Sequence, residues 1–389
     1  MSRPRDTSQA DPRLAGTRLS ETSPRPRLRI LHLILVLGET NGQYNEHCLP
    51  LKDERDLSIV TYFTPQLTTP REITVYGGDG SPAGFFRALR RALDANSYDA
   101  IHAHAPHSGA LLALALLIWR RFGRLRKSLV YTVQDSFQDY KLRNQVLMVI
   151  SLAFFHRVIF CSHAAYDSLP PIWKRLVGTR QRVCQNAADI DRVDRALALA
   201  DLTRADDRFT IVSIGRLEKV KDPVTVLSAF RSLDDPKARL VYVGAGSLRA
   251  DLERQIRAWG LESQVELRGL VPRDQVFVEC AKADLFVSAS HGEGLPVTVI
   301  EAMASRCPVV LSDIPPHREV KDDADFVRIV GLSDPAGLSG EIRRVRDMPP
   351  QERIEIGQRG RDHVLARFSL PIMHAACEAV YRELPTVSA

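Results

Sequence analysis

The sequence predicts an α/β protein built from two doubly wound domains, each with a parallel sheet. Short apolar runs bounded by polar residues alternate with helical patterns along the chain, which is typical of repeated strand–helix–strand units. The length of 389 residues exceeds what one hydrophobic core usually serves. Polar loops with glycine follow several of the apolar runs, and ligands of such sheets bind outside the carboxyl ends of the strands.

Shifts in composition predict the domain boundaries. Residues 1–27 are rich in Arg, Pro, Ser and Thr with scarcely any large apolar residue, so we expect a disordered tail. A first domain is expected at 28–192 and a second at 208–370, joined by a charged, alanine-rich segment at 193–207 that is a linker or a mobile helix. A helical segment is expected at the end of the chain, at 371–389.

Charge and cysteine usage narrow the class of protein. The formal net charge is +6, but residues 1–27 hold six Arg against three acidic residues, so half of it belongs to the tail. No basic helix with aromatic partners occurs, which argues against nucleic-acid binding. Six scattered cysteines without a CxxC pair, and no apparent secretory signal, predict reduced thiols in a cytoplasmic protein. The longest apolar run, 109–119, is shorter than the about 20 residues of a bilayer span.

Local patterns predict the elements of the first domain. A near-continuous apolar run at 28–37 is typical of a central parallel strand, and apolar residues at helical spacing predict a helix at 81–93. Further strands are expected at 57–63, 98–104, 129–133, 158–162 and 182–184, and further helices at 110–119, 164–169 and 172–176.

Three histidines lie close together in the sequence at 102–107. His102 and His104 share one face of the strand at 98–104, and His107 follows. No Asp, Glu or Cys accompanies them at a familiar metal-ligand spacing, so zinc is the less favoured interpretation. We expect strand-end histidines that bond backbone groups or substrate hydroxyls.

The apolar helix at 110–119 is followed by a cluster of cations: Arg120, Arg121, Arg124, Arg126 and Lys127. An apolar helix with such a cluster could lie against an anionic membrane, which makes Ala110–Lys127 a candidate for peripheral membrane contact. Cations at a helix C-terminus also complement the helix dipole, and we favour this second interpretation.

The second domain is expected to begin with a strand at 209–215. Asp222 and Pro223 are typical of the N-cap and first residue of the helix that follows, at 223–230. Arg216 and Lys221 lie in the loop between these two elements, where a planar guanidinium and an ammonium suit a diphosphate. The alternative is a pair of solvated loop cations. Further strands are expected at 240–246, 265–271, 284–289, 308–312 and 326–330, and further helices at 247–259, 297–304, 349–368 and 372–384.

Residues 288–313 carry the most informative pattern. Glu293 lies in a loop after a strand and Glu301 eight positions later on a helix with Pro296 in its first turn. A helix N-terminus at the carboxyl end of a strand can bind phosphate, and carboxylates beside it can accept hydrogen bonds from a sugar diol. The alternative is two solvated glutamates near a helix N-terminus.

The E-x7-E spacing, followed by Ala-Met-Ala and a Pro-Val-Val strand, resembles the donor site of retaining family 4 glycosyltransferases. The resemblance implies the GT-B fold, in which two Rossmann-like domains face each other across a cleft. It implies acceptor binding by the first domain, nucleotide-sugar binding by the second, and a C-terminal helix that crosses back onto the first domain.

The resemblance also implies roles for particular residues, each by its match to the family pattern. The catalytic residues would be Arg216, Lys221 and Glu293, and the donor would be bound by Glu301, Gly294, Leu295, Pro296, Gly215, Arg268, Gly269, Asn41 and Gly42. The acceptor side of the cleft would include His104, Gln134, Asp135 and Asn186. No metal site is implied, and Asp189-Ile-Asp191 is rejected as a metal-binding DxD because that motif belongs to a different fold.

The sequence departs from the family pattern at several positions. Gln134 stands where the family commonly has histidine, so this position cannot titrate near neutral pH. Ala187 replaces a glycine, the glycines of the loop at 38–42 are separated by three residues, and the loop at 313–319 lacks its common glycines. A non-catalytic binding protein therefore stays an alternative, as does a sugar-nucleotide epimerase or phosphorylase of the same fold.

The expected function is retaining transfer of a hexosyl-type sugar from a nucleoside-diphosphate sugar to a hydroxyl acceptor. The resemblance places it in cell-envelope or exopolysaccharide glycan or glycolipid synthesis, with a glycan or lipid-linked acceptor and no cofactor. The expected location is the cytoplasm, or the inner face of the cytoplasmic membrane. We expect front-face attack by the acceptor rather than a covalent intermediate on Glu293. The sequence does not indicate the base, the sugar, the linkage or the acceptor.

Overall fold

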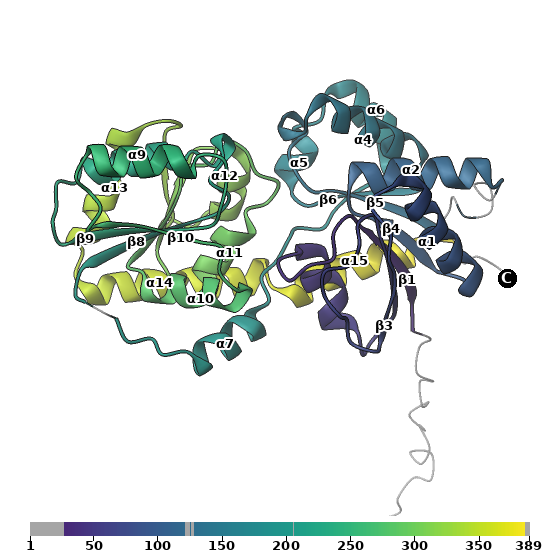
Figure 1. Cartoon of the computed structure of the whole chain (residues 1–389), viewed down its shortest axis with the longest axis horizontal. Coiled ribbons are helices and arrows are strands. Elements are labelled where there is room, and N and C mark those ends of the chain that lie inside the picture. The colour runs from purple at the N-terminus through teal and green to yellow at the C-terminus, as the bar shows by residue number, and fades with distance from the viewer. Residues whose placement is uncertain (1–26, 121–124, 126–127, 205, 386–389) are drawn as a thin grey trace, which may run out of the picture.

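The computed structural model describes residues 27–120, 125, 128–204 and 206–385, which form two lobes (Figure 1). The first lobe contains a parallel sheet of seven strands in the order β3-β2-β1-β4-β5-β6-β7. The strands are β1 (Arg29–Ile34), β2 (Asp56–Thr61), β3 (Ile73–Tyr76), β4 (Ala100–Ala103), β5 (Leu129–Val133), β6 (Arg157–Phe160) and β7 (Gln181–Val183).

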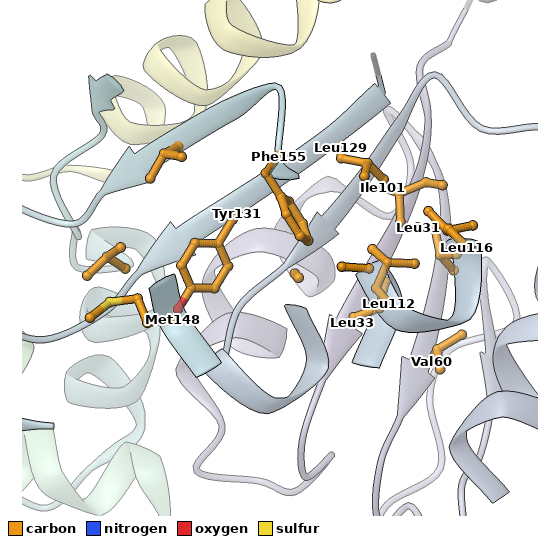
Figure 2. Packing of buried hydrophobic residues seen from close by; sticks show 14 of the residues in the cluster. Leu31, Leu33, Val60, Ile101, Leu112, Leu116, Leu129, Tyr131, Met148 and Phe155 are labelled. Atoms are coloured by element: carbon orange, nitrogen blue, oxygen red, sulfur yellow. The ribbon is translucent and has the colours of Figure 1, made fainter. Parts of the chain in front are cut away.

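Helices cover both faces of this sheet (Figure 1). One face packs against α1 (Pro82–Ala95), α2 (Pro106–Ile118), α4 (Leu142–Phe154), α5 (His163–Asp167) and α6 (Pro171–Val177). Figure 2 shows this core, where the Tyr131 ring lies edge-on to Phe155 at 5.7 Å between centroids. The other face packs against α15 (Leu370–Arg382), with short turns at Tyr44–Cys48, Leu49–Leu51, Phe137–Asp139 and Gly178–Arg180 completing the domain.

The second lobe contains a parallel sheet of six strands in the order β10-β9-β8-β11-β12-β13. These are β8 (Phe209–Ile214), β9 (Ala238–Val243), β10 (Val265–Gly269), β11 (Leu285–Ser288), β12 (Val309–Ser312) and β13 (Arg328–Val330). One face packs against α8 (Pro223–Arg231), α9 (Arg249–Ala258) and α13 (Pro335–Asp347). The other packs against α7 (Ile190–Leu199), α10 (Arg273–Lys282), α11 (Val297–Ala304) and α14 (Pro350–Arg367); α12 (Pro315–Lys321) follows β12.

The strand orders fix where each lobe can bind a ligand. In the first sheet β1 has β2 on one side and β4 on the other, and in the second β8 has β9 and β11. The chain reverses its direction of winding at these strands, which opens a crevice at their carboxyl ends. The loops after β1, β8 and β11 therefore lie where ligands of doubly wound sheets bind.

The predicted fold class is confirmed, including the return of the C-terminal helix to the first lobe. Helix α15 packs on the first sheet, and its side chains form ion pairs with that domain: Glu378 with Arg55 at 3.1 Å, and Glu383 with Arg157 at 2.9 Å and Arg182 at 2.6 Å. The domain boundaries themselves stay predictions, and the tail expected at 1–27 lies almost wholly outside the described residues.

Several elements were not predicted. Strand β3 and helices α4, α10 and α13 were missed, and the expected loop at 313–319 contains α12. In α10 the apolar residues Phe277, Val278 and Cys280 are nearly consecutive, so the helical period is hidden. The strand expected at 265–271 is shorter in the structure, where Arg268 and Gly269 are the last two residues of β10.

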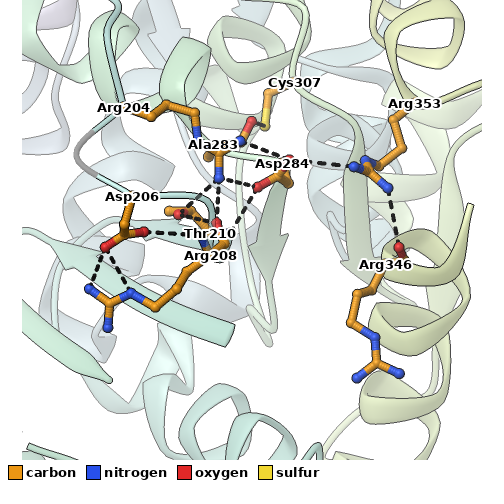
Figure 3. A network of polar contacts seen from close by, with 9 residues as sticks. All are labelled: Arg204, Asp206, Arg208, Thr210, Ala283, Asp284, Cys307, Arg346 and Arg353. Carbon is orange, nitrogen blue, oxygen red and sulfur yellow. Dashed lines mark hydrogen bonds and ion pairs between the residues drawn. The ribbon is translucent and has the colours of Figure 1, made fainter. Parts of the chain in front are cut away.

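A polar network surrounds the amino end of β11, at the opposite end of the strand from the candidate site (Figure 3). The Asp284 carboxylate accepts a hydrogen bond from the Thr210 backbone N–H at 2.9 Å and pairs with Arg204 at 2.7 Å. Arg353 of α14 lies 3.8 Å away on the other side. Asp284 thus ties together β11, the start of β8 and α14, which fixes the two strands that carry the candidate site.

All six cysteines are buried free thiols. Among the described residues, no helix combines the length and the apolar character that crossing a bilayer requires.

Candidate active site

An ion pair joins the loops after β8 and β11. Lys221 Nζ lies 2.5 Å from Glu293 Oε1, and both side chains are largely shielded from water. Local sequence positions the lysine: Asp222 caps α8 by accepting from the Thr225 backbone N–H, and Pro223 is the first residue of the helix. The structure therefore brings together one cation and one acid that the sequence placed 72 residues apart.

Arg216 lies beside this pair but is unpaired. Its side chain is exposed, and within the described part of the chain its guanidinium has no ion-pair or hydrogen-bond partner. Arg216 lines a small pocket of about 10 Å³ together with Gly215, Lys221 and the serines at 288 and 290. An uncompensated guanidinium beside an ammonium is an arrangement suited to binding an anion.

Glu301 is buried in a separate network that bridges the two lobes. Its Oε1 accepts a hydrogen bond from Arg273 of α10, which also lies 3.8 Å from Glu46 of the first domain. Burial raises the pKa of Glu301, and Arg273 opposes this shift. Glu301 Oε2 and Arg273 Nε are buried without a hydrogen-bond partner among the described residues. A buried carboxylate oxygen without a partner is costly, so this pair is suited to a ligand with hydroxyl groups.

The loop at 292–296 is pressed against the first lobe. Ser136 Oγ donates to the Glu293 carbonyl at 2.8 Å, and Ser162 Oγ donates to the Gly294 carbonyl at 2.7 Å. A Cβ added at Gly294 would lie 1.8 Å from the Gln134 carbonyl oxygen. Leu295 is buried in the core of the second lobe, and Pro296 caps α11. The two lobes are therefore in direct contact at the candidate site.

This contact predicts that Gly294→Ala separates the lobes. The added Cβ must move by about 1.6 Å, from 1.8 Å to an ordinary contact of 3.4 Å, against a backbone oxygen that cannot rotate away. Small-angle X-ray scattering should give a larger radius of gyration for this variant. Gly340→Ala in α13, where an added Cβ meets nothing within 4 Å, is the matched control. Equal radii for both variants and the wild type would contradict the closed contact.

The residues expected on the acceptor side differ in what they contact. The Asp135 side chain faces the ion pair: burial and the nearby Glu293 raise its pKa, and Lys221 and Arg216 oppose this shift. Gln134 contributes its carbonyl to the Gly294 contact, and the Asn186 backbone N–H donates to the Cys161 carbonyl at 3.1 Å.

The loop after β1 approaches the Glu301 network rather than the Lys221–Glu293 pair. Asn41 Oδ1 accepts from the Tyr44 backbone N–H at 2.8 Å, which starts the turn that carries Glu46. A Cβ at Gly42 would lie 3.1 Å from Glu46 Oε1. Asn41 and Gly42 therefore lie next to Glu46, and Glu46 in turn lies next to Arg273 of the Glu301 network.

His104 does not line the contact between the lobes. It is buried in a stack with His102, at 4.0 Å between ring centroids, and its Nε2 lies 2.9 Å from His32 Nδ1. His47, on the turn at Tyr44–Cys48, covers the stack at 5.1 Å from the His104 ring. No sequence pattern predicts that this turn folds over the strand end.

The histidine stack was tested for its fit to a metal ion. Ring nitrogens of His32, His102 and His104 lie within 4.8 Å of one another; the expected third histidine, His107, is not part of this group. Two imidazoles on a tetrahedral zinc have centroids about 5 Å apart, since each ring centre lies about 3.2 Å from the ion. The His102 and His104 rings are closer than this, and both nitrogens of His102 already bond Tyr381 and Thr132. The arrangement is a hydrogen-bonded stack rather than a convergent ligand set.

Arg268 points away from Arg216 and Lys221. It pairs with Glu266 at 2.8 Å and with Glu279 of α10, and it lines a separate pocket of about 240 Å³ under the segment that enters β8. Gly269 has φ +78° and accepts a backbone hydrogen bond from Gly244 at 2.8 Å, which keeps it at the end of β10. The structure therefore does not bring the Arg268 side chain to the candidate site.

A much larger pocket lies elsewhere. A groove of about 1090 Å³ lies between α7, α15 and residues 49–55 and contains none of the expected site residues. The pocket at Arg216 is far smaller than the about 300 Å³ that ligand sites of this kind start from. We therefore base the site on its chemistry rather than on pocket size.

Sequence reasoning missed the residues that act across the lobes: Glu46, Ser136, Asp139, Ser162 and Arg273. Arg273 opens a helix that was not predicted, and the two serines resemble ordinary loop residues. Glu319 also joins the lobes, because its carboxylate accepts from the His163 and Ala164 backbone N–H groups at 2.9 and 2.8 Å.

Comparisons with known proteins agree across both lobes. A family model described as "Glycosyl transferases group 1" matches residues 194–363, and one described as "Glycosyltransferase Family 4" matches residues 58–192. The chain is 26% identical to the putative glycosyltransferase EpsD of Bacillus subtilis, covering 85% of this chain and 84% of that protein.

Two further similarities concern a shorter region and the fold. The chain is 32% identical to N-acetylgalactosamine-N,N'-diacetylbacillosaminyl-diphospho-undecaprenol 4-alpha-N-acetylgalactosaminyltransferase of Campylobacter jejuni, over 39% of this chain and 40% of that protein. The crystal structure of Anabaena Alr3699/HepE in complex with UDP and glucose aligns with a TM-score of 0.74 at 18% identity, over 92% of this chain and 100% of that one.

Proposed function

Because the chain belongs to the family 4 glycosyltransferases of GT-B fold, we propose that it transfers a hexosyl-type sugar from a nucleoside-diphosphate sugar to a hydroxyl acceptor with retention. The second domain, at 208–370, would bind the donor and the first, at 28–192, the acceptor. The observation that carries this proposal is the unpaired Arg216 beside the Lys221–Glu293 pair.

Arg216 and Lys221 are suited to binding the diphosphate that leaves the sugar. Breaking the bond to the sugar leaves negative charge on the β-phosphate, which Arg216 can bind with two parallel N–H donors. Lys221 would leave Glu293 for the phosphate when the donor arrives, and Glu293 would then accept hydrogen bonds from the sugar. The N-terminus of α11, behind Pro296, adds partial positive charge. These protein cations replace a divalent metal ion, so none is required.

The Glu301–Arg273 pair fits the nucleoside. Glu301 Oε2 has no partner among the described residues, and a ribose diol supplies the hydroxyl donors that it lacks. In this proposal the lobes open to admit the donor and close again, as the contact between Gly294 and Gln134 allows. Reaction then follows front-face attack by the acceptor, and the covalent alternative on Glu293 is disfavoured because Lys221 holds that carboxylate.

The acceptor belongs to glycan or glycolipid synthesis in this proposal. The EpsD and Campylobacter relatives are glycosyltransferases, the second named for a diphospho-undecaprenol acceptor. The departures from the family pattern do not exclude catalysis. Ala187 is buried without a positive φ, so no glycine is needed there, and Gln134 acts through its backbone.

A thermal-shift screen of UDP-, GDP- and ADP-sugars tests the donor class. A ligand at 100 times its Kd stabilises the protein by about 2.7 kcal/mol, which is a readily measured shift of the unfolding midpoint. One nucleotide series is expected to give this shift in EDTA, and the shift should shrink in Glu301→Ala. No shift with any nucleotide would overturn the proposal.

We also propose that the first domain contacts a membrane through the face formed by α2, α4 and α6, which lie together in Figure 1. Apolar side chains on this face are exposed, including Ile118 at 62% and Leu142 at 76%, and Lys141 and Arg143 flank Leu142. Apolar residues among cations suit an anionic lipid surface. Of the cation cluster expected after α2, the residues at 121, 124, 126 and 127 lie outside the described part.

Co-sedimentation with vesicles of anionic and zwitterionic lipid tests this surface. Burying an apolar side chain contributes about 1.5–3 kcal/mol, so replacing Ile118 and Leu142 together by Gln should weaken binding to anionic vesicles at least about tenfold. Ile354→Gln in α14 is the matched control, because Ile354 is also 62% exposed but lies in the other domain. Equal binding of all three proteins would refute the assignment of this face.

A further inference from the structure

The loop after β5 presents an aspartate that none of the assigned roles uses. Asp139 comes from the first domain, and its Oδ1 and Oδ2 would lie 2.3 and 2.4 Å from a Cβ added at Gly292. Gly292 directly precedes Glu293 in the second domain. The Asp139 carboxylate therefore stands against the backbone of the donor loop, from the side that belongs to the acceptor domain.

The loop that carries Asp139 is held rigidly. The backbone N–H groups of Gln134 and Asp135 donate to the Tyr140 hydroxyl at 3.1 and 3.2 Å. Gln145 Nε2 donates to the carbonyls of Phe137 and Tyr140 at 3.2 and 3.0 Å. Such fixed loops hold a side chain in one position before the substrate arrives, which is what positioning a reactant requires.

The carboxylate itself has no assigned structural partner. It is exposed, and among the described residues it forms no ion pair and accepts no hydrogen bond. Partial burial, together with Asp135 and Glu293, raises its pKa to about 6, and Lys221 opposes this shift. Its contact with Gly292, the chain neighbour of Glu293, places Asp139 beside the reaction centre.

We propose that Asp139 binds the reacting hydroxyl of the acceptor and holds it against the donor sugar. This inference rests on the proposed function. The hydroxyl donates its hydrogen bond to the Asp139 carboxylate while the acceptor oxygen forms its bond to the anomeric carbon. The bond from that carbon to the β-phosphate oxygen breaks, and the departing diphosphate takes the hydroxyl proton. Asp139 thus ends the cycle in the ionisation state in which it began.

Hydrolysis of the donor by water tests this proposal without an identified acceptor. The probe is the nucleotide sugar that gives the largest shift in the thermal screen, and hydrolysis is followed from pH 4.5 to 8.5 in the full chain. Asp139→Asn is expected to lower kcat about 10- to 100-fold with the donor KM unchanged, as loss of one positioned hydrogen bond to a reactant does. The wild-type kcat/KM should fall below about pH 6, and this acid limb should be absent in Asp139→Asn.

Two further variants separate position from folding. Gly292→Ala must displace the Asp139 carboxylate, so it should lower kcat in the same way, while the donor thermal shift shows that the protein is folded. Gln138→Ala, an exposed neighbour on the same loop, should behave as the wild type. An unchanged kcat and pH profile in Asp139→Asn would overturn the inference, as would a raised donor KM with unchanged kcat. A wild-type protein that neither binds nor hydrolyses any donor would refute the proposed function instead.

Discussion

Arg216→Ala is expected to lower kcat about 10²- to 10³-fold, the effect of removing one preorganised donor from a developing negative charge. The guanidinium is exposed and unpaired among the described residues, so its removal leaves no buried acid without a partner and should not unfold the protein. The loss should fall on kcat more than on the donor KM, since the charge on the β-phosphate grows in the transition state. Steady-state kinetics of both proteins with the donor from the screen measure this.

Lys219→Ala is the matched control for the loss at Arg216. Lys219 lies in the same loop and is exposed, yet it has no ion pair with Glu293. Lys221→Ala should lower kcat and also release Glu293, whose partner it is at 2.5 Å. If Lys219→Ala lost as much activity as Arg216→Ala, the assignment of the diphosphate to Arg216 and Lys221 would be wrong.

The second large effect is a loss of stability in mild acid. Burial holds the pKa values of His32, His102 and His104 well below the ordinary value of 6.5. Unfolding restores that value, so below pH 6.5 the unfolded chain binds protons that the folded chain does not. The free energy of unfolding therefore decreases as the pH is lowered. Each histidine then contributes a slope of up to about 1.4 kcal/mol per pH unit.

Neighbouring groups modify this slope in known directions. Burial raises the pKa of Glu46 to about 7 from its ordinary value of 4.5. Between these two pH values the folded chain binds a proton at Glu46 that the unfolded chain does not, which offsets the slope of one histidine. A hydrogen bond between the side chains of His47 and Cys377 raises the pKa of His47. The stabilisation that His47 contributes is therefore already complete below pH 6.5, and it does not change the slope in that range. Three histidines against one glutamate leave a net slope of about 2.7 kcal/mol per pH unit from this cluster.

Denaturant unfolding at pH 7.5, 6.5 and 5.5 measures the effect. His104→Gln removes one of the three groups, so the slope below pH 6.5 should fall by about 1.4 kcal/mol per pH unit relative to the wild type. His163→Gln is the matched control, because His163 is exposed and lies outside the stack. Identical slopes for the wild type and His104→Gln would contradict the assigned burial of the stack.

Local chemistry explains what the sequence could predict. The strand β8, the loop with Arg216 and Lys221, and the helix α8 follow one another within a few residues, and Asp222 with Pro223 marks the helix start. The E-x7-E pattern likewise lies in one strand–loop–helix unit. Both units reach the same edge of the sheet because β8 and β11 are neighbours, which the winding order of such sheets dictates.

Contacts across the lobes could not be predicted in this way. Arg273 is far from Glu46 in the sequence, and Asp139 is far from Gly292. Such pairs depend on how the domains close, which no local period encodes. Arg268 is a further case: its sequence position matched the family pattern, but only the structure shows that Glu266 and Glu279 hold its side chain.

The most direct test of the account is the anomeric configuration of the first transfer product, followed by NMR in the presence of EDTA. The account predicts that the product keeps the configuration of the donor, that EDTA does not slow its formation, and that Arg216→Ala forms it about 10²- to 10³-fold more slowly. A product with inverted configuration, or a rate that collapses in EDTA, would contradict the claim that fixed protein cations drive a retaining transfer.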